Sequence, residues 1–365
     1  MDYMNILLGL LFAYFLVHGV VIFSLRRSKR VAPGPFPLPI IGNLHLLGDK
    51  PHISLTQLAK KHGPIMNLKL GQVNTVVISS SVLAKQVMQK QDLSFSSRSV
   101  PDTIYACNES DFSVIWLPVN SQWKILRKIM NSHIFSGHNL DVSKHLRSEK
   151  VQELIDYCDK SGKNCEAVNI GRAAFRTSIN FLSNTIFSKD LTDPSSDSAK
   201  EFKDLVWNIM VEAGKPNLVD YFPFLRKIDP QGRRRRMTNH FTKVLQLMSG
   251  LIDERLNERK MGNHTNGGVL DSLLNICPQE IDRNHIEHLF LVVYFLSLSS
   301  FEVTYVLESL LLDIIGSYTL TLGSILNSFN WKLQGGIAPN DLDMEEKFGI
   351  TLAKAQPLLA IPVPL

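Results

Sequence analysis

Over most of this chain, apolar and polar positions follow the spacing of helices. From Arg233 to Lys260 apolar residues recur at steps of three and four with charged residues between them, which predicts one long helix. Shorter helices are predicted at Ile53–His62, Val82–Gln91, Gln122–Ile129, Lys144–Asp159, Ala173–Phe187 and Glu201–Ala213. The run Val73–Ser79 is typical of a strand, and the tail from Gly335 is more strand-like. Because no internal repeat is present, the pattern predicts a mainly α fold with a small β part.

The N-terminal segment has a different pattern. Residues Tyr3–Leu25 contain no charged side chain, and a membrane-spanning helix needs about 20 apolar residues. A basic stop and a proline-rich hinge follow over residues 26–40. Basic residues after the apolar run favour the cytosolic side, so we expect a single-pass anchor at residues 3–25 and a body that faces the cytosol. The alternative is a cleaved secretory signal, but the apolar run is too long for one and no small-residue cleavage site precedes Arg26.

Composition narrows the classes of partner. The chain has 365 residues, is 44% hydrophobic and carries a net charge of +5, part of which comes from the basic stop. This modest charge gives no case for a nucleic-acid partner. The four cysteines, Cys107, Cys158, Cys165 and Cys277, include no Cys-x-x-Cys spacing, so neither a disulfide framework nor a zinc site is indicated.

Several motifs of the body match one family. They are the hinge Ala32–Pro39, Ile41–Leu44, Lys61–Ile65, Phe95–Arg98 and the Trp-x-x-x-Arg helix Trp123–Lys128. Together with the anchor they resemble the start of a plant microsomal cytochrome P-450, a haem-thiolate monooxygenase. Residues Glu212–Pro223 and Asp229–Gly232 look like the terpenoid-hydroxylating branch close to geraniol 8-hydroxylase.

The resemblance implies a function and a location. It implies an endoplasmic-reticulum membrane protein that binds haem, takes electrons from an NADPH-dependent reductase and hydroxylates a small lipophilic, terpenoid-like substrate with O2. It also implies that Trp123 and Arg127 reach the haem propionates. Four residues apart, they lie on one helix face and offer an indole N–H and a guanidinium to anionic oxygens.

The similarity is interrupted in the second half of the chain. Residues 41–290 resemble the N-terminal part of the cytochrome P-450 domain, and residues 322–365 resemble its C-terminal end. Residues 291–321 between them do not resemble the family. The uncharged stretch Leu289–Phe301 is too short for a second membrane span.

The motifs that carry the family's chemistry fall in that gap. A haem-thiolate enzyme needs a Cys in a Phe-x-x-Gly-x-Arg-x-Cys-x-Gly loop, and none of the four cysteines lies in one. The segment Glu302–Thr304 does not match the oxygen-activating motif. We therefore expect an incomplete fold with no axial Cys, no catalytic residue and no stably bound haem. A gene-model error, a splice variant and a decayed gene remain as explanations.

This expectation has one consequence for stability and leaves one alternative function. A truncated relative has lost segments that pack on its remaining helices, so a poorly stable, aggregation-prone body is expected. The alternative function is that of a non-catalytic, membrane-anchored protein that binds a reductase or a sister enzyme.

Three other groups of residues are candidates for binding or packing roles. The run Arg233–Arg236 is interpreted as the solvated start of a helix, with contact to membrane lipid as the functional alternative. His285 and His288 beside Glu287 are weak metal candidates, because no third ligand is evident. The apolar residues Phe222, Phe224 and Leu225 are assigned either to a substrate entrance or to packing.

Overall fold

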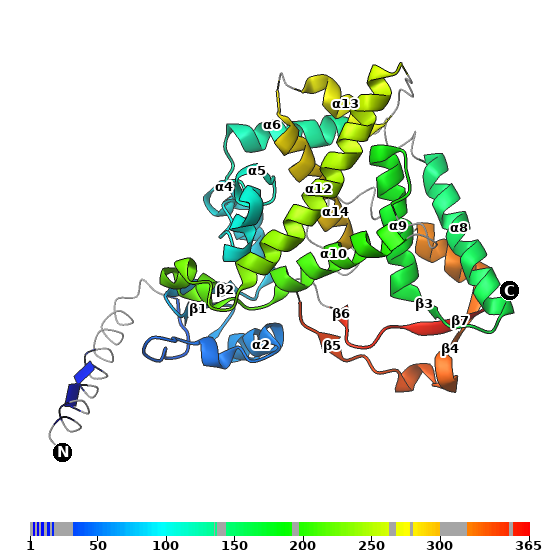
Figure 1. Cartoon of the computed structure of the whole chain (residues 1–365). Coiled ribbons are helices and arrows are strands. Elements are labelled where there is room, and N and C mark those ends of the chain that lie inside the picture. Colours follow the sequence, from blue (N-terminus) through cyan, green and yellow to red (C-terminus); the bar gives the residue numbers. More distant parts are fainter. Residues whose placement is uncertain are drawn as a thin grey trace. The chain divides into compact units, whose positions relative to one another are not determined.

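The structure is a computed structural model of the chain (Figure 1). It describes residues 32–134, 136, 144–191, 197–262, 268–277, 280–299, 320–349 and 353–365, and near the N-terminus Tyr3, Ile6, Gly9, Leu10, Ala13, Tyr14 and Val17. The chain divides into two compact units, each described here by itself. The first unit comprises Met1–Ser97 and Asn217–Gln231, and the second comprises Arg98–Pro216 and Gly232–Leu365.

Two predicted segments lie mostly outside this description. The anchor at residues 3–25 is represented by a few isolated positions, and residues 300–319 of the bridging segment are not described. In the part of the chain that is described, no helix has the length and apolar character needed to cross a bilayer. The anchor and the bridging segment therefore stay predictions.

The first unit contains an antiparallel hairpin and several short helical elements. Strands β1 (Ile65–Leu70) and β2 (Val73–Ile78) are joined through Gly71, which has a φ of 60°. The helical elements are η1 (Leu44–Leu46), α2 (Pro51–His62), α3 (Ser81–Lys85), η2 (Gln86–Lys90), α4 (Asp92–Phe95), α11 (Leu218–Tyr221) and η5 (Pro223–Lys227). The predicted strand at Val73 and the predicted helix ending at His62 are confirmed. The helix predicted over Val82–Gln91 is instead divided between α3 and the π-helical turn η2.

One face of the hairpin carries the core of the first unit. Met66, Leu68 and Leu70 alternate along β1 and are buried. They pack against apolar residues that include Leu44, Leu47, Leu55 and Leu58. The chain before β1 approaches the strand closely at Gly42, where a Cβ would lie 1.9 Å from the backbone oxygen of Lys69. Only glycine allows this approach at a φ of 61°.

The second unit is mainly helical (Figure 1). Its longer helices are α6 (Ser121–Ile129), α8 (Lys144–Lys163), α9 (Ile170–Phe187), α10 (Asp197–Gly214), α12 (Arg233–Lys260), α13 (Val269–Ile276) and α14 (Arg283–Ser299). Short helical elements are η3 (Asp102–Asn108), α5 (Glu109–Phe112), η4 (Met130–Ile134), η6 (Gln334–Gly336) and η7 (Pro339–Asp341), and residues 320–328 are also helical. Helix α12 has the bounds that the apolar spacing predicts, whereas α8 continues beyond the predicted end at Asp159.

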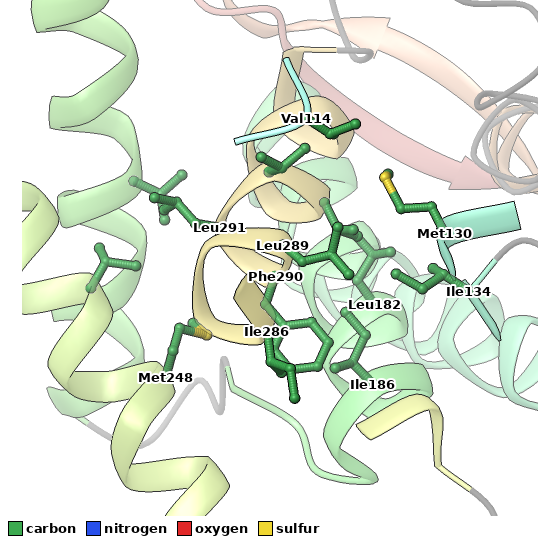
Figure 2. Packing of buried hydrophobic residues seen from close by; sticks show 14 of the residues in the cluster. Val114, Met130, Ile134, Leu182, Ile186, Met248, Ile286, Leu289, Phe290 and Leu291 are labelled. Atoms are coloured by element: carbon green, nitrogen blue, oxygen red, sulfur yellow. The ribbon is translucent and has the colours of Figure 1, made fainter. Parts of the chain in front are cut away.

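The core of the second unit is one cluster of buried apolar side chains. The buried residues of α12 follow the predicted helical spacing and are Met237, Phe241, Val244, Met248 and Ile252. From α14, Ile286, Leu289 and Phe290 enter the same cluster (Figure 2). Phe290 has no exposed surface, and its ring centroid lies 5.0 Å from that of Phe187 on α9. Helix α14 thus fills the middle of this core.

The β part of the second unit is small. Strand β7 (Leu359–Pro364) lies between β3 (Val168–Asn169) and β4 (Phe329–Leu333), and both pairings are antiparallel. Strands β5 (Glu346–Lys347) and β6 (Ala353–Lys354) form a separate antiparallel pair. The predicted mainly α fold with a small β part and a strand-like tail is confirmed.

Candidate functional site

The two residues predicted to contact haem propionates lie on α6. The Asn120 Oδ1 accepts a hydrogen bond of 2.8 Å from the backbone N–H of Trp123, which caps the helix and sets its start. Trp123 and Arg127 follow at a spacing of one turn, so they share a side of α6. The indole N–H of Trp123 donates to the backbone oxygen of Val114 at 3.0 Å. In this structure the indole therefore bonds to the chain's own backbone.

Arg127 keeps the chemistry expected of an anion-binding group. It is half-buried, and burial lowers the pKa of its guanidinium from the ordinary value. Arginine nevertheless stays charged at neutral pH because its ordinary pKa is so high. A guanidinium held at a partly dry site pairs strongly with a carboxylate through two parallel N–H donors. The propionate assignment for Trp123 and Arg127 stays a prediction.

The four cysteines are placed as structural residues. Cys158 on α8 is 1% exposed, and burial raises the pKa of its thiol to about 11, which keeps it protonated at neutral pH. The Cys107 thiol in η3 donates weakly to the backbone oxygen of Thr238 at 3.7 Å. Cys165 is exposed and Cys277 follows the end of α13. The absence of an axial cysteine stays a prediction.

The histidines at the start of α14 have partners other than a metal. The Nδ1 of His285 lies 2.7 Å from the Asp282 Oδ1, and its Nε2 lies 2.9 Å from the Gln122 amide nitrogen. Glu287 accepts a hydrogen bond from an arginine of its own helix. Among the described residues, no group of three or more His, Cys, Asp or Glu side chains is placed to hold a metal ion. The metal hypothesis for His285 and His288 therefore has no geometric support.

A buried acid–imidazole pair is the feature that sequence reasoning missed. His288 on α14 and Glu109 on α5 are each 4% exposed, and the His288 Nδ1 lies 2.5 Å from the Glu109 Oε2. Phe112 stacks on the His288 ring with a centroid separation of 5.0 Å. Burial of two polar side chains is tolerated because each satisfies the other. The two residues are 179 positions apart in the sequence, and no local sequence pattern predicts such a contact.

The arginines at the start of α12 form more ion pairs with acidic side chains than predicted. Arg233 Nη1 lies 3.7 Å and Arg236 Nη2 lies 3.2 Å from the Glu212 Oε2. Arg234 pairs at 3.3 Å with Asp102, whose side chain is fully buried. Burial alone would raise the pKa of Glu212, but hydrogen bonds from two cationic side chains outweigh it and the pKa is lowered. The prediction of a solvated run is wrong for Arg233, whose side chain is only 11% exposed.

The apolar residues predicted for an entrance or a packing surface lie in the first unit. Phe224 in η5 is 66% exposed, and its ring centroid lies 6.1 Å from that of Phe222. Phe222 and Leu225 are half-buried. Both interpretations of this surface stay open.

Comparisons with known proteins support one family. The cytochrome P450 family model matches residues 32–295. The chain is 46% identical to geraniol 8-hydroxylase of Catharanthus roseus over 492 aligned residues, which cover 99% of each protein. It is 68% identical to lauric acid 10-hydroxylase of Petunia hybrida over 78% of this chain and 50% of that protein. It is 49% identical to geranylhydroquinone 3''-hydroxylase of Arnebia euchroma over 80% of this chain and 60% of that protein.

Proposed function

The chain belongs to the cytochrome P450 family, and on that premise we propose that it derives from a membrane-bound monooxygenase that hydroxylates a small lipophilic, terpenoid-like substrate. The observation that carries this proposal is the similarity to geraniol 8-hydroxylase across 99% of both chains. The relative from Arnebia euchroma is likewise named for hydroxylation of a geranyl compound. The lauric acid hydroxylase widens the range of substrates to other lipophilic molecules.

The proposal includes an internal loss of sequence. The alignment with geraniol 8-hydroxylase extends over 492 positions, whereas this chain has 365 residues, so the excess positions face gaps in this chain. The family model stops at residue 295, close to residue 291, where the predicted bridging segment begins. Both observations support a loss between Leu289 and Leu322, the region in which intact relatives carry the thiolate loop.

The state of the cofactor follows from the loss. In intact relatives the haem supplies an iron centre that binds and activates oxygen. Arg127, with Trp123 beside it, would hold the propionates. The sequence supports the absence of an axial ligand, because none of the four cysteines lies in the family's thiolate loop. We infer that this chain has no monooxygenase activity, because the chemistry of its intact relatives depends on the sulfur ligand of the iron.

Location and partners belong to the same proposal. The body is held at the endoplasmic-reticulum membrane by residues 3–25, with the reductase as the electron donor of intact relatives. The described side chains of that segment support contact with lipid, since Tyr3 is 91% and Leu10 is 65% exposed. The basic stop after the anchor supports a body on the cytosolic side.

One spectrum tests the proposal. The chain is expressed in microsomes, reduced and exposed to carbon monoxide, with an intact relative as the positive control. We expect the thiolate-type absorption band from the relative and none from this chain, because the sulfur ligand is missing. A clear band from this chain would disprove the loss of ligation. Sequencing the gene between the codons for Leu289 and Leu322 then separates a gene-model error from a true loss.

A further inference from the structure

The two outer edges of the β1–β2 hairpin are not equivalent. In an antiparallel pair, directly opposite residues alternate between those that exchange backbone hydrogen bonds and those whose backbone groups point away. The Ser79 N–H donates at 2.8 Å to the oxygen of Pro64, the residue opposite it in the register that pairs Ile65 with Ile78. The backbone N–H and C=O groups of Ile65 and Ile78 therefore point away from the partner strand. The same holds for every second pair after them.

The neighbours of β1 confirm this alternation. Asn67 and Lys69 are the next two β1 residues of the outward class. The Asn67 N–H donates to the Pro33 oxygen at 2.8 Å, and Lys69 accepts a backbone hydrogen bond from the chain that precedes β1. Their opposite residues on β2 are Val76 and Asn74. The backbone N–H and C=O groups of these two residues consequently point away from the hairpin on the other side.

Among the described residues, the outer edge of β1 is covered, whereas that of β2 has no backbone partner. Residues 33–43 bond to β1 along its outer side. Within the ranges that the structure describes, the outward backbone groups of Asn74, Val76 and Ile78 bond to no other backbone group. Asn74 is exposed, and Val76 is 56% exposed. An exposed strand edge of this kind is a template for pairing with another strand.

We propose that the edge of β2 is a self-association surface on which β2 of a second copy of this chain adds antiparallel to it. With a two-fold axis at Val76, that residue faces its own copy, and Asn74 faces Ile78 of the partner copy. All these residues have outward backbone groups, so each would exchange both backbone hydrogen bonds with the residue opposite. The same patch thus serves both copies, as a closed two-fold dimer requires.

The composition of β2 favours its own copy as the occupant. The strand reads Val-Asn-Thr-Val-Val-Ile and carries no charge, so like charges do not oppose one another across the axis. Natural sheets protect exposed edges with lysine, proline or bulges, and β2 contains none of these. Its β-branched residues are those that stabilise cross-strand pairs. This inference goes beyond the proposed function and needs neither haem nor reductase.

A cross-link tests the register of the pair. Hydrogen-bonded opposite residues have Cα atoms about 5.5 Å apart, which suits a disulfide. The full chain carrying Val76→Cys is kept in excess detergent micelles, so that anchors do not share a micelle, and is oxidised mildly. We expect a disulfide-linked dimer well above the level of the parent chain. Val82→Cys is the control, because Val82 is 66% exposed on α3 and lies off the strand. Equal dimer from both variants, or none from Val76→Cys, would overturn the proposal.

Introducing a charge at the edge of β2 tests the pairing without depending on an oxidised product. Val76→Lys places two ammonium groups opposite each other, so the dissociation constant measured by sedimentation should rise by about tenfold and recover in part at high salt. The exposed-site control Val82→Lys should leave the constant unchanged. Salt-dependent recovery separates edge pairing from simple unfolding of the hairpin. A parent chain that stays monomeric at micromolar concentration, or an equal effect of Val82→Lys, would disprove self-association through β2.

Discussion

The core of the second unit and the hairpin of the first unit both bury their apolar side chains, yet they differ in their backbones. Phe290 on α14 and Met66 on β1 are each 0% exposed. In α14 the backbone hydrogen bonds lie within the helix, so side-chain packing completes the element. In β2 one row of backbone groups has no backbone partner among the residues that the structure describes. Burial of the side chains of a strand therefore does not pair the backbone groups at its outer edge.

Side-chain burial and an unpaired strand edge also differ in their contribution to the free energy of folding. A buried side chain of this size contributes about 1.5–3 kcal/mol through loss of exposed apolar surface, whether it lies on a helix or on a strand. A solvated strand edge costs little while water satisfies it, but it leaves an open site for another chain. With the proposed pairing of β2, the association of this protein through its first unit would depend on concentration.

The largest expected effect compares the core of the second unit with an exposed position of the first unit. Phe290→Ala should lower the free energy of unfolding by about 3–5 kcal/mol, because it leaves a cavity at a fully enclosed site. Leu93→Ala, at a residue of α4 that is 78% exposed, should change it by less than about 0.5 kcal/mol. Urea unfolding followed by circular dichroism measures both. Similar losses from the two variants would show that the second unit is not closely packed around Phe290.

The next effect concerns the buried polar contact of the second unit. Glu109→Gln keeps the shape of the side chain but replaces the carboxyl group that faces His288 with an amide, and it should cost about 2 kcal/mol. Glu153→Gln is the matched control, because that acid pairs with Lys150 but is itself 49% exposed. It should cost less than about 1 kcal/mol. An equal effect of both variants in thermal unfolding would remove the buried pair as a distinct source of stability.

A smaller effect should appear as a dependence on pH. Burial alone would raise the pKa of Asp271, but hydrogen bonds from Arg255 and Arg259 outweigh it and lower the pKa. The folded state therefore binds a proton less readily than the unfolded state, and this stabilisation is present above pH about 4 and is lost as the pH falls. Asp271→Asn should flatten the acid side of the stability profile and cost about 1–2 kcal/mol at neutral pH.

The control for that profile is an acid whose own side chain is exposed. Asp253 pairs with Arg283 at 2.6 Å, but its side chain is 57% exposed. Asp253→Asn should leave most of the acid slope in place, since water screens exposed ion pairs. If Asp253→Asn flattened the profile as much as Asp271→Asn, burial of the Asp271 carboxylate would not be the cause of the slope.

The smallest effect tests a local feature of the candidate site. Asn120→Ala removes the side-chain oxygen that caps α6 and should destabilise the second unit by about 1 kcal/mol. Asn120→Asp keeps an acceptor and should be close to neutral. Thermal unfolding of the two variants side by side distinguishes loss of the cap from a general effect at this position. A neutral result for alanine would mean that tertiary packing, not the cap, sets the start of α6.

Some elements were predictable because their signal is local. The bounds of α12 follow from apolar residues such as Phe241 and Met248 at helical spacing, and they are confirmed. Strand β1 was not predicted, although Met66, Leu68 and Leu70 alternate with polar residues and could have revealed it. The pairing of Trp123 with the Val114 oxygen was beyond prediction, because a side chain's partner depends on how the chain folds back.

By itself the sequence determined the helical periods, the small β part and the family, since each depends on residues near one another or on motifs read in order. The tertiary structure alone decided which groups meet. It placed Glu109 against His288, and it left the outer edge of β2 without a backbone partner in the described part of the chain. The physical reason is the separation along the sequence over which each feature is determined. Periodic burial is set within a few turns of chain, whereas a buried polar pair and a sheet edge are completed by segments remote in sequence.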